Sequence, residues 1–429
     1  MTVTETGFGY KKEPLISPFG FKGNYIDELW QTVARVGNGT NCGTGVGVLS
    51  VLWSDSAVFE ENLRENGNKM MLEIAEYALE LIKSRNFKNP IELLNTIFDD
   101  VYEYGRKITN RKDLRKTFVL NSLVSVDNAL WQLYSAEKRE KDFLKLIPQV
   151  YAPFLESRQK KLANIPLVTY NMTLEDVKKL ALSGAPLLKI KIGSDPDSDK
   201  SQEKMLEWDK NRIKQIHETV KDFHTDHTDC GHICYYLDAN GRYEAKDTLK
   251  KLLDFADKIG MLSRILILEE PFPEENKTDV SGLGVRIAAD ESAHSNYDIA
   301  ERISLGYRAF ALKPIAKTLS LTLEMLKTAR ENDIPCFCAD LTVNPYMVEI
   351  NKNIASRLPL FPGMKVGILE SNGKQNYRNW EKMKTYDPLY KKYPSVDCVN
   401  GIFNIEESMF NTSFGIFEPL PEYEKIAEL

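Results

Sequence analysis

The chain lacks the features that mark membrane-spanning, secreted and nucleic-acid-binding proteins. No stretch approaches the ~18 consecutive apolar residues that a membrane-spanning helix needs, and the first residues lack the basic start and apolar run of a signal peptide. Lys plus Arg number 56 and Asp plus Glu number 62, so the net charge of −6 offers no basic surface for nucleic acid. We therefore expect a cytoplasmic protein with no membrane and no nucleic-acid partner.

Cysteine is also scarce, with six residues in a chain of 429. This number cannot build a disulfide scaffold, and it agrees with a reducing compartment. Cys336 and Cys338 lie on one face of a predicted strand. Cys230, His232 and Cys234 suggest a metal, but no second pair of ligands follows them, so ordinary buried or loop cysteines are the simpler interpretation.

The N-terminal part, residues 1–160, has the pattern of an α+β domain. Two apolar, β-rich runs, Leu29–Val36 and Val46–Trp53, flank the glycine-rich segment Gly37–Gly45. A phosphate loop does not fit this segment, because no Lys-Ser/Thr pair follows it and the next run reads as a strand. We predict a hairpin connection here, and helical spacing of apolar residues predicts three helices over residues 57–140.

From Ile165 onward, short apolar runs alternate with helical patterns, at spacings typical of βα units. This alternation predicts an α/β fold, a (β/α)8-type barrel, over residues 161–395. A polar insert is expected at about residues 194–231, before the third strand, and residues 396–429 are expected to return to the N-terminal domain. The eight predicted strands are Pro166–Asn171, Leu187–Ile192, Cys234–Asp238, Ile265–Glu269, Ile287–Asp290, Ala309–Lys313, Cys336–Asp340 and Lys365–Glu370.

Seven of these eight strands end in ionisable residues. In a barrel of this type the chemistry lies at the C-terminal ends of the strands, and an ionisable side chain there is costly unless it is paired or bound to metal. We therefore predict that the site is built from the following residues: Lys189 and Lys191, Asp238, Glu269, Asp290, Lys313, Asp340 and Glu370.

Three consecutive strands end in Asp238, Glu269 and Asp290. Neighbouring strands lie ~4.8 Å apart, so these carboxylates would repel one another unless a cation lies between them. Hard oxygen ligands favour Mg²⁺, with Mn²⁺ possible. Helix capping or pairing with arginine would explain one such residue, but a metal site explains the series better.

Lysines occupy two opposite sides of the predicted barrel. Lys189 and Lys191 are two residues apart on the second strand, so both point inward, and Lys313 ends the sixth strand, across the barrel. A nearby ammonium group and a divalent cation would both lower a lysine pKa from its usual ~10.4. Lys191 and Lys313 are therefore candidate bases on opposite faces of a substrate.

These motifs, taken together, resemble the enolase superfamily, and within its mandelate racemase and muconate-lactonizing group they resemble the two-lysine branch that includes dipeptide epimerases. The resemblance covers nearly the whole chain. No histidine lies on the sixth or seventh predicted strand, which argues against the His-Asp pair of the acid-sugar dehydratases in that superfamily. The matching segments are Leu188–Lys191, Leu237–Asn240, Leu268–Pro271, Ala289–Ser292 and Leu312–Pro314.

The resemblance implies a role for each residue. Asp238, Glu269 and Asp290 would bind Mg²⁺, Lys191 and Lys313 would act as acid and base, and Lys189 would assist Lys191 and the substrate carboxylate. Residues 1–160 would form a capping domain whose loops near Ser17–Asn24 and Trp53–Ala57 close over the substrate. Substrate-binding or supporting positions would be Asn240 near the metal, Glu291, Asp340 and Glu370, the last matching an acidic position that can hold a substrate ammonium.

The shared reaction of the superfamily is removal of the proton α to a carboxylate, which gives a metal-stabilised enolate. The superfamily is a known example of catalysis by a lysine base together with Mg²⁺. We expect an isomerase that racemises or epimerises an amino-acid derivative or dipeptide, acting as a homo-oligomer on a small carboxylate. Dehydration of an acid sugar or cycloisomerisation, both on the same site, is the alternative. A homologue that binds a ligand without catalysis is a third possibility.

Overall fold

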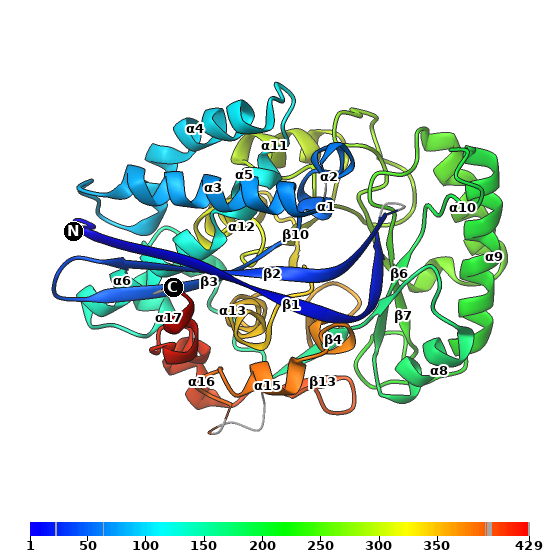
Figure 1. Ribbon diagram of the computed structural model, residues 1–429. Helices are drawn as coiled ribbons and strands as arrows, with labels where there is room; N and C mark the ends of the chain where they lie inside the picture. Colours follow the sequence, from blue (N-terminus) through cyan, green and yellow to red (C-terminus); the bar gives the residue numbers. More distant parts are fainter. Residues whose placement is uncertain (22–23, 63, 391, 393–396, 428–429) are drawn as a thin grey trace.

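The structure is a computed structural model that describes the chain except residues 22–23, 63, 391, 393–396 and 428–429. It has two parts (Figure 1). A three-stranded antiparallel sheet carries helices in the first part, and a mostly parallel sheet with surrounding helices forms the second. This is the predicted combination of an α+β N-terminal domain and a (β/α)8-type barrel.

The N-terminal sheet has the order β1-β2-β3. Strands β1 (Glu5–Phe21) and β2 (Asn24–Gly37) form a long antiparallel hairpin that crosses toward the barrel (Figure 1). Strand β3 (Cys42–Leu49) pairs with β2 on its other side. The helices of this part are α1 (Val51–Ser54), α2 (Ser56–Glu61), α3 (Arg64–Ile82), α4 (Pro90–Thr109), α5 (Lys116–Ser122) and α6 (Val124–Lys138).

Two predictions for this part were wrong in detail. The apolar run that ends at Trp53 is a strand only as far as Leu49, because Val51 begins helix α1. The predicted hairpin connection within Gly37–Gly45 is confirmed, but it is shorter than predicted, since β2 ends at Gly37 and β3 already begins at Cys42. A side chain is excluded at Gly45 because α6 packs directly on β3: a Cβ there would lie 2.1 Å from a backbone oxygen of α6.

The barrel closes through one continuous stretch of chain. Strand β4 (Lys161–Ile165) pairs with the last barrel strand, and β5 (Leu167–Val168) pairs with the second. Only Pro166, which has no amide hydrogen to donate, separates them, so the first barrel strand begins earlier than the predicted Pro166–Asn171. The other strands are β6 (Leu187–Lys191), β7 (Cys234–Asp238), β8 (Ile265–Glu269), β9 (Ile287–Ala289), β10 (Ala309–Leu312), β11 (Cys336–Cys338) and β12 (Gly367–Glu370).

Helices follow the barrel strands, and several begin at residues that cap helix N-termini. The side chains of Thr173, Ser201, Ser295, Thr318 and Asn344 each accept a hydrogen bond from a backbone amide in the first turn. These helices are α8 (Leu174–Leu182), α9 (Gln202–Val220), α10 (Lys246–Lys258), α11 (Asn296–Ser304), α12 (Leu319–Glu331) and α13 (Pro345–Ala355).

Half of the expected insert at residues 194–231 is helix α9, which packs between α8 and α10. It is therefore a regular helix of the barrel ring, and the additional chain is limited to the segments on either side of it. The C-terminal residues form β13 (Ile402–Asn404), which pairs with β4, and α17 (Pro421–Ala427), which contacts the N-terminal sheet. Within the described residues, no helix is long and apolar enough to span a membrane.

Candidate active site

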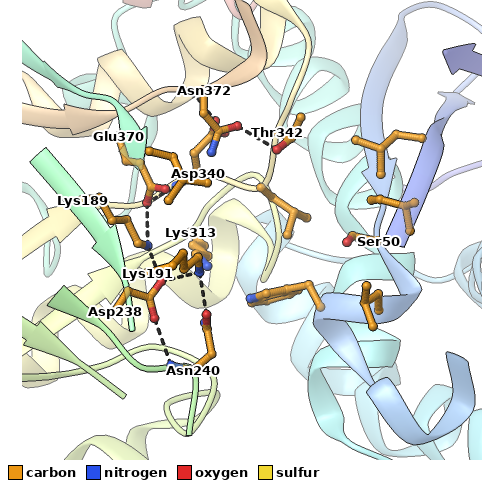
Figure 2. Close-up of a pocket in the computed structure, with 16 residues that line it drawn as sticks. Ser50, Lys189, Lys191, Asp238, Asn240, Lys313, Asp340, Thr342, Glu370 and Asn372 are labelled. Atoms are coloured by element: carbon orange, nitrogen blue, oxygen red, sulfur yellow. Dashed lines mark hydrogen bonds and ion pairs between the residues drawn. The ribbon is translucent and has the colours of Figure 1, made fainter. Parts of the chain in front are cut away.

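Strand register brings the predicted site residues to one end of the barrel. Lys191 pairs with Asp238, and Asp238 pairs with Glu269, across the parallel strands β6, β7 and β8. Asp290 and Lys313 follow β9 and β10 directly. All ten predicted residues are buried, none more than 8% exposed. The sequence pattern therefore identified side chains that lie together, as the labelled residues in Figure 2 show.

Two lysines bind the carboxylates of β7, β8 and β12. The Lys189 ammonium lies 2.9 Å from Asp238 Oδ2, 2.8 Å from Glu269 Oε2 and 3.1 Å from Glu370 Oε2. Lys191 donates to Asp238 Oδ2 and to Asn240 Oδ1, both at 2.6 Å. Lys189 thus bridges three strand ends, and Lys191 lies at the edge of the same group.

A third and a fourth lysine bind Asp290. Lys313 forms an ion pair with Asp290 Oδ2, and its ammonium lies 4.5 Å from the centre of the Trp53 ring. Lys317, which sequence reasoning missed, is fully buried, with its ammonium 3.1 Å from Asp290 Oδ1. Lys317 also donates to the backbone oxygens of Asp290 and Ala293, at 2.5 and 3.0 Å. Its position four residues after Lys313 was the only signal in the sequence.

These contacts set the pKa values of the carboxylates. Burial raises the pKa of Asp238, but attraction to Lys189 and Lys191 outweighs it, so the net shift is downward. Asp290 is likewise lowered, because Lys313 and Lys317 outweigh burial. Burial and the neighbouring Asp238 raise the pKa of Glu269 well above its usual value. The pKa values of Asp238 and Asp290 fall while that of Glu269 rises, because these carboxylates lie close to one another and to the lysines.

Contacts with carboxylates set the pKa of Lys313 in this arrangement, and its expected lowering by a bound divalent cation stays a prediction. Burial lowers the pKa of Lys313, but attraction to Asp290 and Glu269 outweighs it and raises the pKa above its ordinary value. Lys189 is raised for the same reason, by Asp238, Glu269 and Glu370. Direct contact with a carboxylate is stronger than the repulsion between ammonium groups that the sequence argument emphasised.

The donors at these strand ends fit a hard divalent cation in type. Asp238, Glu269 and Asp290 supply carboxylate oxygens from three consecutive strands, and Glu269 Oε1 is buried without a hydrogen-bond partner. In the described part of the chain no three acidic, histidine or cysteine side chains form a ready coordination group. Lysine ammonium groups lie between the carboxylates instead, so a cation would have to displace flexible lysine side chains.

Asn240 and two glutamates support this group. Asn240 accepts from Lys191 and donates to Glu291 Oε1 at 3.0 Å. Glu270, a second residue that sequence reasoning missed, accepts from the backbone amide of Asp290 at 2.6 Å. Burial and the Glu291 carboxylate raise the pKa of Glu270 to about 7. The paired glutamates of Glu269-Glu270-Pro271 were the available signal for it.

Asp340, in the loop after β11, and Glu370, at the end of β12, are the two acidic residues of the last barrel strands. Asp340 accepts from the backbone amides of Asn372 at 2.7 Å and Val343 at 3.4 Å, so its oxygens hold the loop after β11. Glu370 Oε2 accepts from Lys189 and from the Asp340 amide, each at 3.1 Å. Burial and the Glu370 carboxylate raise the pKa of Asp340 to about 6. Backbone amides therefore hold the Asp340 carboxylate in place.

A cavity of about 530 Å³, including space open to solvent, lies between the barrel and the N-terminal part. Figure 2 shows Lys189, Lys191, Asp238 and Lys313 on the barrel side and Ser50 on the facing side. Trp53 lines the cavity, but the predicted loop Trp53–Ala57 is mostly helical, since α1 ends at Ser54 and α2 begins at Ser56. Residues 22–23 of the predicted loop Ser17–Asn24 lie outside the described residues. The apolar lining consists of Ile26, Leu29, Leu52, Trp53, Leu167 and Leu341.

No family model matches the chain, and no curated protein matches its sequence. Solved structures do match. One match is a dipeptide epimerase from Cytophaga hutchinsonii complexed with Mg and D-Ala-L-Val. The alignment covers 88% of this chain and 89% of the epimerase, at 15% identity and TM-score 0.63. A second match is the L-Ala-D/L-Glu epimerase from Bacillus subtilis. The alignment covers 89% of this chain and 92% of that epimerase, at 14% identity and TM-score 0.63.

A third match spans almost the whole length of both chains. An enolase superfamily member of unknown function from Enterococcus faecalis V583 aligns over 99% of this chain and 98% of its own, at 15% identity and TM-score 0.63. The two-domain fold is therefore that of the enolase superfamily. Within it, the structural neighbours belong to the mandelate racemase and muconate-lactonizing group and include dipeptide epimerases, as the sequence motifs predicted.

Proposed function

We propose that this protein is a Mg²⁺-dependent racemase or epimerase that removes the proton α to a carboxylate, acting on an amino-acid derivative or dipeptide with an apolar side chain. The observation that carries the proposal is the placement of Lys191 and Lys313. They end β6 and follow β10, which lie on opposite sides of the barrel, and both line the cavity. The ends of β7, β8 and β9, with their carboxylates, lie between them.

Asp238, Glu269 and Asp290 would hold the metal. Bound there, Mg²⁺ would supply positive charge beside the substrate carboxylate as negative charge develops on it. Lys189 adds an ammonium group to the same region, because it lies among Asp238, Glu269 and Glu370. Such preorganised charge is needed because an α-proton is a very weak acid.

Lys191 and Lys313 would exchange protons with the two faces of the α-carbon. One lysine accepts the proton while the other, still protonated, returns one to the opposite face, which inverts the centre. The attraction of Asp290 and Glu269 keeps the pKa of Lys313 high. If a cation engaged these carboxylates, that attraction would weaken, and burial would then lower the lysine pKa toward the range of a base.

The apolar lining favours amino-acid derivatives over acid sugars. Ile26, Leu29 and Leu52 come from the N-terminal part, and Leu167 and Leu341 come from the barrel. Sugar hydroxyl groups placed against these side chains would lose their hydrogen bonds to water without replacement. An apolar side chain would instead gain about 25 cal/mol for each Å² that it buries. Two solved dipeptide epimerases, from Cytophaga hutchinsonii and Enterococcus faecalis V583, were crystallised with D-Ala-L-Val and L-Leu-L-Tyr, whereas the Bacillus subtilis enzyme is an L-Ala-D/L-Glu epimerase.

Proton NMR in D₂O tests the proposal with pooled apolar dipeptides, N-acylamino acids and acid sugars. In the presence of Mg²⁺ the wild type should exchange an α-proton and invert the centre, and EDTA should stop both. Lys191→Ala and Lys313→Ala should each lose exchange from one epimer, by roughly 10²- to 10⁴-fold. The matched control is Lys327→Ala, a surface lysine of α12 paired with Glu331, which should keep full activity.

Other outcomes would contradict the proposal in distinguishable ways. Exchange that survives in both lysine variants would refute the two-base assignment. Loss of water, or ring formation in the product, would identify a lyase or cycloisomerase on the same site. A Mg²⁺-dependent rise in Tm for each variant shows that it is folded. Ligand binding with no Mg²⁺ effect and no exchange would indicate a protein that binds without catalysis.

A further inference from the structure

Two cysteines lie at the end of the barrel opposite to the proposed active site. Cys234 is the first residue of β7, the strand that ends at Asp238, and Cys230 lies in the turn just before it. The turn belongs to a small hairpin in which His224 and His232 form an antiparallel bridge. Gly231, with φ of +72°, allows the chain to reverse there.

The thiol groups are held close together. The two Sγ atoms are 3.6 Å apart, and both thiols point to the backbone oxygen of His232, at 3.6 Å from Cys230 and 3.7 Å from Cys234. Cys230 is exposed, whereas Cys234 is buried. A reagent from solution can therefore reach the first thiol, and the second is already within reach of it.

The surroundings give the two thiols different reactivity. Burial raises the pKa of Cys230, but hydrogen bonding with the His232 backbone and with the Thr228 and Cys234 side chains outweighs it and lowers the pKa below the ordinary value. Burial raises the pKa of Cys234 well above that value. Because the thiolate is the reactive form, Cys230 is the sulfur that reacts first.

We propose that Cys230 and Cys234 form an oxidisable dithiol site, which a hydroperoxide converts into an intramolecular disulfide. The Cys230 thiolate attacks a peroxide oxygen, the O–O bond breaks, and an alcohol or water leaves, so that Cys230 becomes a sulfenic acid. The Cys234 sulfur then attacks Cys230 sulfur. The S–S bond forms, the S–O bond breaks, and the oxygen leaves as water with the Cys234 proton. The cysteines lose two electrons and the peroxide gains them.

Other cysteines of the chain lack this arrangement. Cys42 is exposed on the N-terminal sheet, where no thiol contact to it is recorded among the described residues, and Cys398 is only partly accessible. Cys336 and Cys338 are buried on β11, and burial raises the pKa of both thiols. Cys42 therefore serves as an internal control for simple exposure.

The test uses the whole reduced protein with a chelator, limiting hydrogen peroxide, and alkylation of the remaining thiols after unfolding. Peptide mass spectrometry should find the Cys230–Cys234 disulfide as the first product, with Cys42 oxidised at least about tenfold more slowly. Cys42→Ser should behave like the wild type. Cys234→Ser should accumulate sulfenic acid at Cys230, detected with a sulfenic-acid-specific reagent.

Two results would overturn the proposal. One is oxidation of Cys230 past the sulfenic acid while Cys234 remains free to alkylate. The other is equal oxidation of Cys42 and Cys230. The mapping in the wild type decides between these outcomes even if a variant fails to fold. It does not depend on the proposed enzyme activity, because the site lies at the other end of β7.

Discussion

At the scale of single residues, direct ion pairs with lysines compensate part of the negative charge at the strand ends. Asp290 shows this well, because Lys313 binds one of its oxygens and Lys317 binds the other. Lys317 has no exposed surface and donates to two backbone oxygens as well. We infer that Lys317 holds Asp290 and the loop after β9 in position.

Replacing Lys317 with Met should therefore destabilise the protein strongly. The substitution leaves one oxygen of Asp290 and two carbonyl oxygens without their buried partner, and breaking a buried pair in this way costs about 3–5 kcal/mol. Thermal or urea unfolding would measure the loss. Lys327→Met, in the partly exposed pair with Glu331, is the control and should change stability by less than about 0.5 kcal/mol. Equal effects of the two substitutions would refute the role of Lys317.

At the scale of secondary structure, the glycines of β3 decide how the N-terminal sheet packs. Gly43 and Gly45 face α6, and a Cβ at either position would lie within 2.5 Å of the helix backbone. The helix can therefore approach the sheet more closely than side chains would permit. The sequence showed the glycines but suggested a turn, because periodicity cannot distinguish a flexible connection from a strand that needs small residues.

Gly45→Ala should show the effect of this close approach. Its methyl group would meet the backbone oxygen of Ser125 at 2.1 Å, so α6 must move, and we expect a loss of at least about 3 kcal/mol in unfolding free energy. Gly37→Ala is the matched control on the neighbouring strand. Its nearest contact is the Glu5 side chain at 3.3 Å, which can move, so the loss should stay below about 1 kcal/mol. Similar unfolding midpoints for both variants would contradict this explanation.

Helix and strand limits were largely predictable where the apolar pattern is strong. Strands β7 and β8 have the predicted limits. The pattern failed at the first barrel strand, because Pro166 interrupts its hydrogen bonding and the chain pairs with different strands on either side. It also failed within residues 57–140, where three helices were predicted, because Leu123 separates α5 from α6.

At the scale of the whole molecule, a buried polar contact joins the N-terminal part to the barrel. Asp127 of α6 accepts hydrogen bonds from the backbone amide of Ser320 at 2.9 Å and from its hydroxyl at 2.5 Å. Trp131 donates to the same hydroxyl at 3.0 Å. Asp127 thus lies at the N-terminus of α12, where a carboxylate is favourable.

Burial nevertheless raises the pKa of Asp127 from 3.8 to about 6. The folded protein then keeps a proton that the unfolded chain releases between about pH 4 and pH 6, so this residue's contribution to stability falls as pH rises through that range. The shift corresponds to on the order of 3 kcal/mol. Asp127→Asn should remove this component.

Urea unfolding at pH 4 and pH 7 would measure the effect as a difference between wild type and variant. Asp127→Asn should therefore lose less stability than the wild type between these values. Asp99→Asn, on the exposed face of α4, should follow the wild type at both. A variant profile parallel to the wild type would show that Asp127 does not titrate in this range.

Several expectations concern the molecule as a whole and stay predictions: the domain limits at residues 160 and 395, the cytoplasmic location, the homo-oligomer, the absence of nucleic-acid and membrane partners, and the roles of individual site residues. Apart from the domain limits, each of these depends on a partner, a compartment or a bound substrate, and so does not follow from how the chain folds on itself.

The sequence by itself determined the alternation of strands and helices and the ionisable residues at the strand ends. Both are local properties, because side-chain period and strand termination depend on neighbours in the chain. Only the tertiary structure decided which groups touch: that Lys189 bridges three strands, that Lys317 supports Asp290, and that apolar residues of the N-terminal part face the lysines. These contacts join residues far apart in sequence, and closure of the barrel fixes their distances.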